Sequence, residues 1–97
     1  MMGKPIWSVS GKFCGMVFDG DVYDERGNHV GYVRDKVVFS SDTGRAVGEF
    51  YDDERVGLRK SRSYSSGSLK VSKVSKSFVS YANKIPLASG GWKDPEF

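Results

Sequence analysis

Short runs of aromatic and β-branched residues alternate with polar turns over the first 58 residues of the chain. A pair of apolar residues precedes each turn: Ile6-Trp7, Val22-Tyr23 and Val38-Phe39. A longer, mostly apolar run follows each turn, at 13–18, 30–33 and 47–51. Residues of these types favour pleated, half-buried backbone. The pattern predicts about seven short antiparallel strands between residue 6 and roughly residue 59, joined as a meander.

A glycine pattern repeats three times along these expected strands. Its form is Gly-x-x-(Val or Cys)-Gly, and it begins at Gly11, Gly27 and Gly44. Each first glycine closes a four-residue turn that starts with Ser or Asp, which is the preference of a type I turn followed by a left-handed glycine. The repeat therefore predicts β-hairpins. Polar pairs at Asp19-Gly20, Arg34-Asp35 and Asp52-Asp53 predict tight links between them.

The second glycine of each repeat falls inside a strand, at positions 15, 31 and 48. Glycine weakens a strand, and it is accepted there for a bulge, a sharp bend, or the close approach of another backbone or ring. We expect the aromatic residue across each hairpin to cover it: Trp7 over Gly15, Tyr23 over Gly31 and Phe39 over Gly48. Regular bends predict hairpins around an axis. A fourth, partial unit is read at 55–58, where Val-Gly-x recurs without a leading turn.

The order of aromatic residue, polar turn, Gly-x-x-Val-Gly and short link resembles the four-fold β-flower family. These are small bacterial proteins in which β-hairpins are related by a pseudo-four-fold axis. The resemblance covers residues 6–58, with three clear units and one partial unit, whereas residues 59–97 carry no matching repeat. It implies a fold, and it implies no established activity and no catalytic residues.

The expected fold class is therefore all-β, with repeated antiparallel hairpins around a pseudo-symmetry axis, and a small β-barrel or meander is the alternative. Ninety-seven residues fit one domain, 1–97. Within it, residues 6–58 form the hairpin repeats, and residues 59–97 form a basic extension, rich in Ser and Lys, that packs back on them. Ile85-Pro86-Leu87 and Trp92 are expected to return to the β part as a final extended segment.

Positive charge is concentrated in this extension. Residues 1–58 hold seven Lys and Arg against ten Asp and Glu, and residues 59–97 hold eight against two. Val71, Val74, Phe78 and Tyr81 share one helical face, but serine and β-branched residues weaken a helix. Helix and strand both stay open for residues 69–82.

The cations of the extension suit contact with phosphates. Tyr64 and Tyr81 add aromatic rings that can stack on single-stranded nucleic acid. The competing interpretation is a solvated basic face, or one that meets the acidic first half of the same or a neighbouring chain. The candidate contacts to nucleic acid or another partner are Arg59, Lys60, Arg62, Lys70, Lys73 and Lys76.

Catalytic and metal-binding chemistry has little support in the sequence. His29 is the only histidine and Cys14 the only cysteine. His29 follows a turn and is expected to be exposed, whereas Cys14 occupies the place of Val30 and Val47 in the other repeats and is expected to be a small core residue. The carboxylates lie mostly at turns, which select Asp for its hydrogen bonding.

We therefore expect no catalytic residue, no metal site and no cofactor. The expected function is a non-enzymatic structural or interaction module that binds a protein partner or a second copy of itself. Nucleic-acid binding through residues 59–84 is the alternative. A lone cysteine favours a reducing, cytoplasmic location, and no apolar run approaches the length of roughly 18 residues that a membrane span needs.

Overall fold

The computed structural model describes residues 3–64, 73–87 and 90–97, and these residues form eight β-strands and no helix. Seven strands lie between residues 4 and 59, as the apolar pattern predicts. The strands are β1 (Lys4–Ser8), β2 (Phe13–Phe18), β3 (Asp21–Asp24), β4 (His29–Arg34), β5 (Val37–Ser40), β6 (Ala46–Phe50), β7 (Arg55–Arg59) and β8 (Trp92–Lys93).

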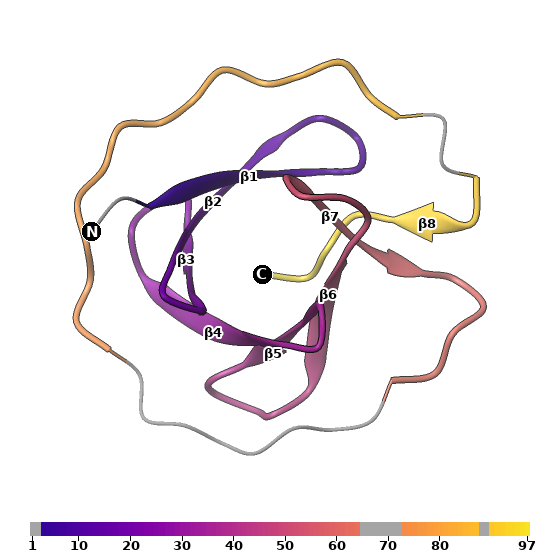
Figure 1. Cartoon of the computed structure of the whole chain (residues 1–97), viewed down its shortest axis with the longest axis horizontal. Helices are drawn as coiled ribbons and strands as arrows, with labels where there is room; N and C mark the ends of the chain where they lie inside the picture. Colours follow the sequence, from indigo (N-terminus) through magenta and orange to yellow (C-terminus); the bar gives the residue numbers. More distant parts are fainter. Residues whose placement is uncertain (1–2, 65–72, 88–89) are drawn as a thin grey trace.

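Strands β1 to β7 close into a barrel (Figure 1). Consecutive strands pair antiparallel, and the barrel closes through a parallel pairing of β1 with β7, in which Trp7 lies opposite Arg55 and Ser8 opposite Val56. Closure leaves β1 without a free edge. The all-β fold of repeated antiparallel hairpins is thus confirmed, and it takes the form of a closed barrel.

A ring of four fully buried aliphatic side chains lies at the centre of the barrel. Ile6, Val22, Val38 and Val56 each have 0% exposure, and each comes from the first strand of a hairpin unit. The interpretation of 55–58 as a copy of the Val-Gly motif is wrong, because Val56 occupies the place of Ile6, Val22 and Val38. β7 is therefore the first strand of the fourth unit.

Each of the three complete hairpins carries a β-bulge at the same place. The register shifts opposite Ile6/Trp7, Val22/Tyr23 and Val38/Phe39, so the residue left unpaired on the second strand is Cys14, Val30 or Val47. Because of the bulge, these three side chains pack against the central ring. The core position predicted for Cys14 is confirmed.

The glycine that follows each bulge allows close packing, but not under the expected ring. A Cβ on Gly15 would overlap the carbonyl oxygen of Tyr23, and one on Gly31 would overlap that of Phe39. At these two positions the atoms that exclude a side chain belong to the backbone of the next unit, so close backbone approach replaces the expected ring cover. At Gly48 the nearest atoms belong to the side chains of Val56, Phe97 and Pro95.

The turn glycines and the first link are as predicted, whereas the second and third links differ. Gly11, Gly27 and Gly44 have φ of +95°, +87° and +74°, the left-handed conformation expected after a type I turn. The second link falls at Asp35-Lys36 rather than Arg34-Asp35, and both of its residues have positive φ. Arg34 instead ends β4, paired with Val37. The third link spans 51–54 between β6 and β7 instead of Asp52-Asp53 alone.

The fourth hairpin is formed by β7 and β8, which pair antiparallel with Leu58 opposite Lys93 and Arg59 opposite Trp92. Its connection, residues 60–91, replaces the four-residue turn of the other units. Within that connection, residues 73–87 run around the outside of the barrel as an arc (Figure 1). We call residues 73–87 the belt. The belt is neither helix nor strand, so both interpretations of 73–82 are wrong, and 69–72 lie outside the described residues.

Two described parts of the extension, the belt and the chain after β8, pack on the barrel. Beyond β8 the chain turns to the middle of the barrel opening (Figure 1), where Phe97 packs against the central ring and Glu96 donates its amide hydrogen to the carbonyl of Val47 at 2.8 Å. The extension thus contacts the barrel both on its outside and at its mouth.

Candidate interaction surface

The belt is attached to the barrel first at the β3–β4 turn. The amide of Lys76 donates to the carbonyl of Gly27 at 2.8 Å, and the Ser75 hydroxyl donates to the Asn28 side chain at 3.2 Å. A Cβ at Gly27 would overlap the carbonyl oxygen of Lys76. The turn glycine therefore has two roles: it adopts a left-handed conformation, and it lets the belt backbone come close.

The same arrangement recurs eight belt residues later, at the β1–β2 turn. The amide of Lys84 donates to the carbonyl of Gly11 at 2.7 Å, and a Cβ at Gly11 would overlap the carbonyl oxygen of Lys84. Asn83 accepts a hydrogen bond from the amide of Phe13 at 2.9 Å. Two equivalent turns, 16 residues apart in the barrel, thus hold belt residues that are eight apart.

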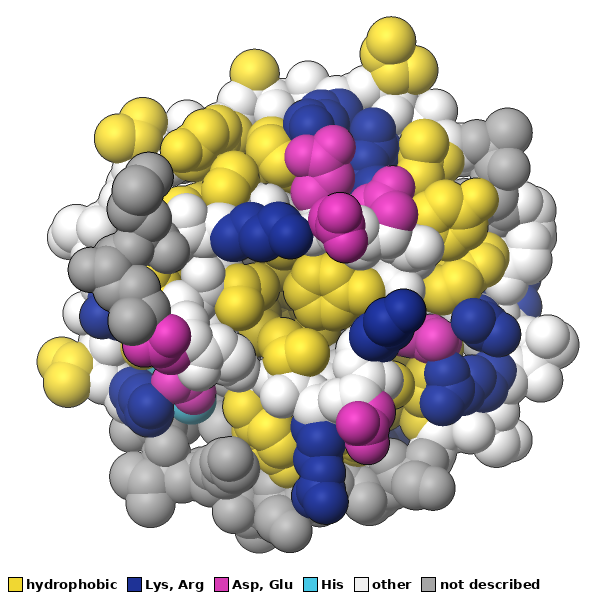
Figure 2. Space-filling view, in the orientation of Figure 1, with side chains coloured by type: hydrophobic (Ala, Val, Ile, Leu, Met, Phe, Trp, Pro, Cys, Tyr) yellow, Lys and Arg dark blue, Asp and Glu magenta, His cyan; other side chains and the backbone are white. Residues whose placement is uncertain are grey.

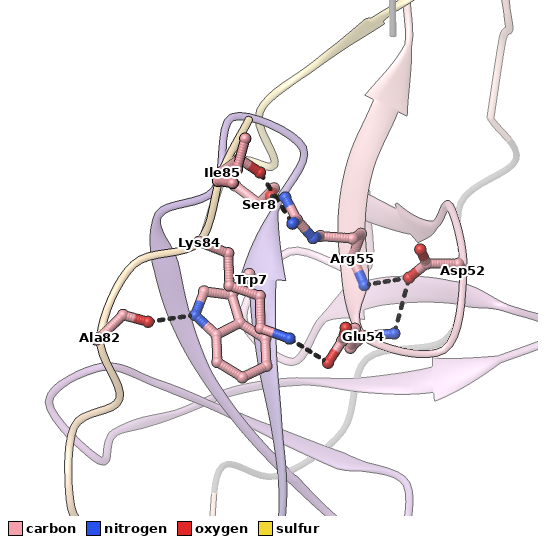
Figure 3. Close-up of polar contacts among 8 residues, drawn as sticks. All are labelled: Trp7, Ser8, Asp52, Glu54, Arg55, Ala82, Lys84 and Ile85. Atoms are coloured by element: carbon pink, nitrogen blue, oxygen red, sulfur yellow. Dashed lines mark hydrogen bonds and ion pairs between the residues drawn. The ribbon is translucent and has the colours of Figure 1, made fainter. Parts of the chain in front are cut away.

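A denser set of contacts fixes the belt near its end (Figure 3). The indole of Trp7 donates to the carbonyl of Ala82 at 2.8 Å, and the ammonium of Lys84 lies 4.0 Å from the centre of that ring. Lys84 also pairs with Glu54 at 2.7 Å. The ammonium of Lys84 therefore binds both a ring and a carboxylate of the barrel, and its aliphatic stem lies along the barrel surface.

Arg55, a buried residue at the start of β7, hydrogen-bonds both to the barrel and to the belt. It is only 7% exposed, and its guanidinium donates to the carbonyl of Ser8 at 3.4 Å and to that of Ile85 on the belt at 2.9 Å. Asp52 fixes the start of β7 by accepting hydrogen bonds from the amides of Glu54 and Arg55 (Figure 3). A buried guanidinium needs such acceptors. Arg55 lies in the β1–β7 pairing that closes the barrel, so its bond to Ile85 fixes the belt relative to that closure.

The other belt cations also bind within the chain. Lys73 forms an ion pair with Asp21, and the ammonium of Lys76 lies above the rings of Phe18 and Tyr23. Burial alone would raise the pKa of Asp21, but hydrogen bonds from Lys73 and His29 outweigh burial and lower it. The acidic first half of the chain is thus a partner of the basic second half.

Aromatic packing fills the space between the belt and the barrel. Trp7, Phe13 and Met16 point outward from the barrel as a second buried cluster, and Phe78 of the belt packs on them. The Tyr81 ring lies 5.7 Å from that of Phe13. Because neighbouring strand residues face opposite sides of a sheet, Ile6 enters the core whereas Trp7 meets the belt.

The opposite side of the belt presents apolar side chains to solvent. Val74, Val79 and Ile85 are 87%, 79% and 83% exposed. Figure 2 shows yellow side chains standing out at the rim of the molecule, along the arc that the belt follows in Figure 1. The ammonium groups of the belt contact the barrel while the aliphatic side chains are exposed to solvent, which is unusual for a solvated surface.

The five candidate contact residues that the structure describes do not form one surface. Lys73 and Lys76 bind Asp21 and aromatic rings under the belt, and Lys70 lies outside the described residues. Arg59, Lys60 and Arg62 come together elsewhere, in a cleft beside β7 and β8. The described candidates of segment 59–84 are therefore divided between two places on the barrel.

The His29 side chain is buried, at 1% exposure, so the expectation of an exposed histidine is wrong. Its Nδ1 accepts the amide hydrogen of Lys73 at 3.1 Å. The ring proton therefore sits on Nε2 and is donated to Asp21 at 3.2 Å. Nδ1 thus holds the belt and Nε2 holds Asp21 on β3, which leaves neither nitrogen for general base catalysis.

The described residues contain no group of three or more His, Cys, Asp and Glu side chains placed to hold a metal ion. Burial raises the pKa of the Cys14 thiol to about 12, which disfavours the reactive thiolate. In the described part of the chain, no helix is long and apolar enough to cross a membrane. Comparison with protein-family models, with curated proteins and with solved structures finds no match.

Proposed function

We propose that this chain is a non-enzymatic interaction module in which the barrel displays the belt and the outer face of the belt binds another protein chain. This proposal rests on three exposed apolar side chains of the belt: Val74, Val79 and Ile85. The belt is hydrogen-bonded to the barrel near both of its ends, at Gly27 and Gly11. Exposed apolar residues in a row, held on a rigid scaffold, suit protein contact at little cost in conformational entropy.

The belt backbone supports the same function. No hydrogen bond joins the amides of residues 77–81 to any other residue that the structure describes. An extended segment with unused amides can accept a strand from a partner, with main-chain bonds for affinity and alternate side chains for specificity. Either another protein or a second copy of this chain can supply that strand.

The test is light scattering of the purified protein, with capture of partners from its own cells. Val79→Ser together with Ile85→Ser should abolish self-association or partner capture without loss of stability, since both side chains are solvent-exposed. Ser80→Ala on the belt and Arg34→Ser on β4 are the controls and should retain binding. A strict monomer that retains no partner, or equal retention by the double variant, contradicts the proposal.

Nucleic-acid binding is the second candidate function, and the positions of the cations limit which residues can contact phosphates. Lys73 and Lys76 already bind the barrel, so phosphate contact falls to Arg59, Lys60 and Arg62. Fluorescence anisotropy with short DNA and RNA at two salt concentrations tests it, because binding through phosphates weakens as salt rises. No binding at low salt rejects it.

The four-unit ring of Ile6, Val22, Val38 and Val56 supports the resemblance to the four-fold β-flower family. We propose membership of that family, hence a bacterial origin. We also propose a cytoplasmic location, which the single unpaired thiol supports.

A further inference from the structure

A cleft of about 380 Å³ lies between the third and fourth hairpin units, apart from the outer face of the belt. Five cations line it: Arg45 just before β6, Arg59 at the end of β7, Lys60 and Arg62 after β7, and Lys93 on β8. Figure 2 shows dark blue side chains gathered on the right of that face, where Figure 1 places β7 and β8. Like charges so close repel one another unless an anion lies between them.

Glu49 orients two of these cations from below. Its side chain is 7% exposed, and its carboxylate accepts from Arg59 at 3.3 Å and from Arg62 at 2.7 Å. The Tyr64 hydroxyl donates to the same carboxylate at 2.8 Å and accepts the amide hydrogen of Arg59 at 2.9 Å. The loop 60–64 is thereby fixed, and most of the five N–H donors of each guanidinium bond to no residue that the structure describes.

Aromatic rings hold the same guanidiniums from the side. Arg62 lies 4.7 Å from the centre of the Tyr64 ring, and Arg59 lies 5.2 Å from that of Trp92. Both arginine side chains stay about half exposed, at 42% and 50%. Guanidiniums that are held in place and still open to solvent are preorganised to receive an anion, because little side-chain entropy is left to lose.

Two further cations have no acidic partner among the residues that the structure describes. Neither Arg45 nor Lys60 forms an ion pair with a described residue, and Lys93 reaches only Glu96, at 3.7 Å. Glu49 and Glu96 together offset two of the five positive charges. The remaining excess matches a group that carries two to three negative charges, such as a phosphate monoester or a pyrophosphate.

From this arrangement we infer that the cleft between the third and fourth units binds the phosphate group of a phosphorylated ligand, through Arg45, Lys60 and Arg62. Arg59 and Lys93 complete the positive rim. Planar guanidinium forks match phosphate oxygens two at a time. The site is independent of the proposed belt interaction, since it uses no residue of the belt.

Isothermal titration calorimetry at low salt tests the inference, with pyrophosphate and AMP as probes. The wild-type protein should bind both. Lys60→Gln and Arg45→Gln remove cations that serve no described carboxylate, so they should leave the fold intact and weaken binding about tenfold each. Arg62→Lys should also weaken it, because the charge remains but the fork is lost.

Arg34→Gln, which removes one exposed charge from β4, is the matched control and should leave the Kd unchanged. Trinucleotides with and without a 5′-phosphate distinguish the source of the phosphate: preference for the 5′-phosphorylated form supports a terminal phosphate group. Absence of binding by pyrophosphate and AMP overturns the inference. Equal binding by wild type, Lys60→Gln and Arg45→Gln overturns it as well, as does an equal loss in Arg34→Gln.

Discussion

Replacing Gly27 by alanine should detach the belt from the β3–β4 turn. Gly27 has φ +87°, and a Cβ there would overlap the carbonyl oxygen of Lys76. Gly20 is a matched control, because it has φ +81° and nothing lies within 4 Å of its Cβ position. Both substitutions carry the left-handed cost of about 1–2 kcal/mol, but only Gly27→Ala opposes the belt.

The extra loss in Gly27→Ala follows from the contacts near Lys76. Displacement breaks the bond from the Lys76 amide and strains those of Ser75 and Lys73, each worth about 1 kcal/mol. It also loosens the half-buried Phe78 ring. Entropy regained by the freed chain offsets part of this. We expect Gly27→Ala to be about 1–2 kcal/mol less stable than Gly20→Ala.

Urea denaturation measures this difference, and limited trypsin digestion locates it. Cleavage after Lys73 and Lys76 should be faster in Gly27→Ala than in Gly20→Ala, while the amides of the barrel core keep their protection from hydrogen exchange. Equal stability and equal cleavage rates in the two variants would refute the claim that the turn glycine holds the belt.

Four further outcomes follow from particular residues. Lys36→Gly should raise the free energy of unfolding in urea by up to about 1 kcal/mol, because Lys36 has φ +66° in a two-residue link; a loss of stability would contradict this. Glu49→Gln should lower stability by about 1–3 kcal/mol, since the buried carboxylate has two arginine partners; an unchanged urea midpoint would count against the ion pairs. Asp21 has a lowered pKa, so its contribution to the free energy of unfolding is present above the unfolded pKa and is lost as pH falls through the folded pKa. Asp21→Asn should therefore weaken the fall of stability with decreasing acid pH, and an unchanged pH dependence would contradict the ion pair. Cys14, with its pKa raised from 9.0 to about 12, should react with a thiol reagent at pH 8 on the order of a thousand times more slowly in the folded than in the urea-unfolded protein; similar rates would show that the thiol is accessible.

The hairpin part of the fold is predictable from sequence because its signals are local. A turn that starts with Ser or Asp and ends in a left-handed glycine fixes each connection, and alternation decides that Val22 faces the core while Tyr23 faces outward. Bulges at Cys14, Val30 and Val47 also follow from a repeated motif. Each choice depends on residues within one hairpin.

The belt could not be predicted in the same way, because contacts with distant residues determine its conformation. Its backbone is held at Gly27 and Gly11, so neither helical nor strand periodicity describes it. Burial of His29 follows from the same cause, since Lys73 of the belt bonds to its ring. One signal was present: Lys76 and Lys84 are eight residues apart, half the 16-residue step between those glycines.

The phosphate cleft shows a similar limit. Arg59, Lys60 and Arg62 are conspicuous in the sequence, but Arg45 and Lys93 join them only because the third hairpin lies beside the fourth. The long connection between β7 and β8 hides that fourth hairpin, since its second strand comes after residue 91. No local pattern links strands so far apart in the chain.

Site-specific photocrosslinking in the cells that make this protein tests the central claim, that the outer face of the belt is a protein-binding surface. A photoreactive phenylalanine analogue replaces Val79, which is 79% exposed on the belt, and in a separate variant it replaces Arg34, exposed on β4. We predict a discrete crosslinked protein, either a partner or a second copy, from position 79 and none from position 34. No adduct from position 79, or the same adducts from both positions, would contradict the account.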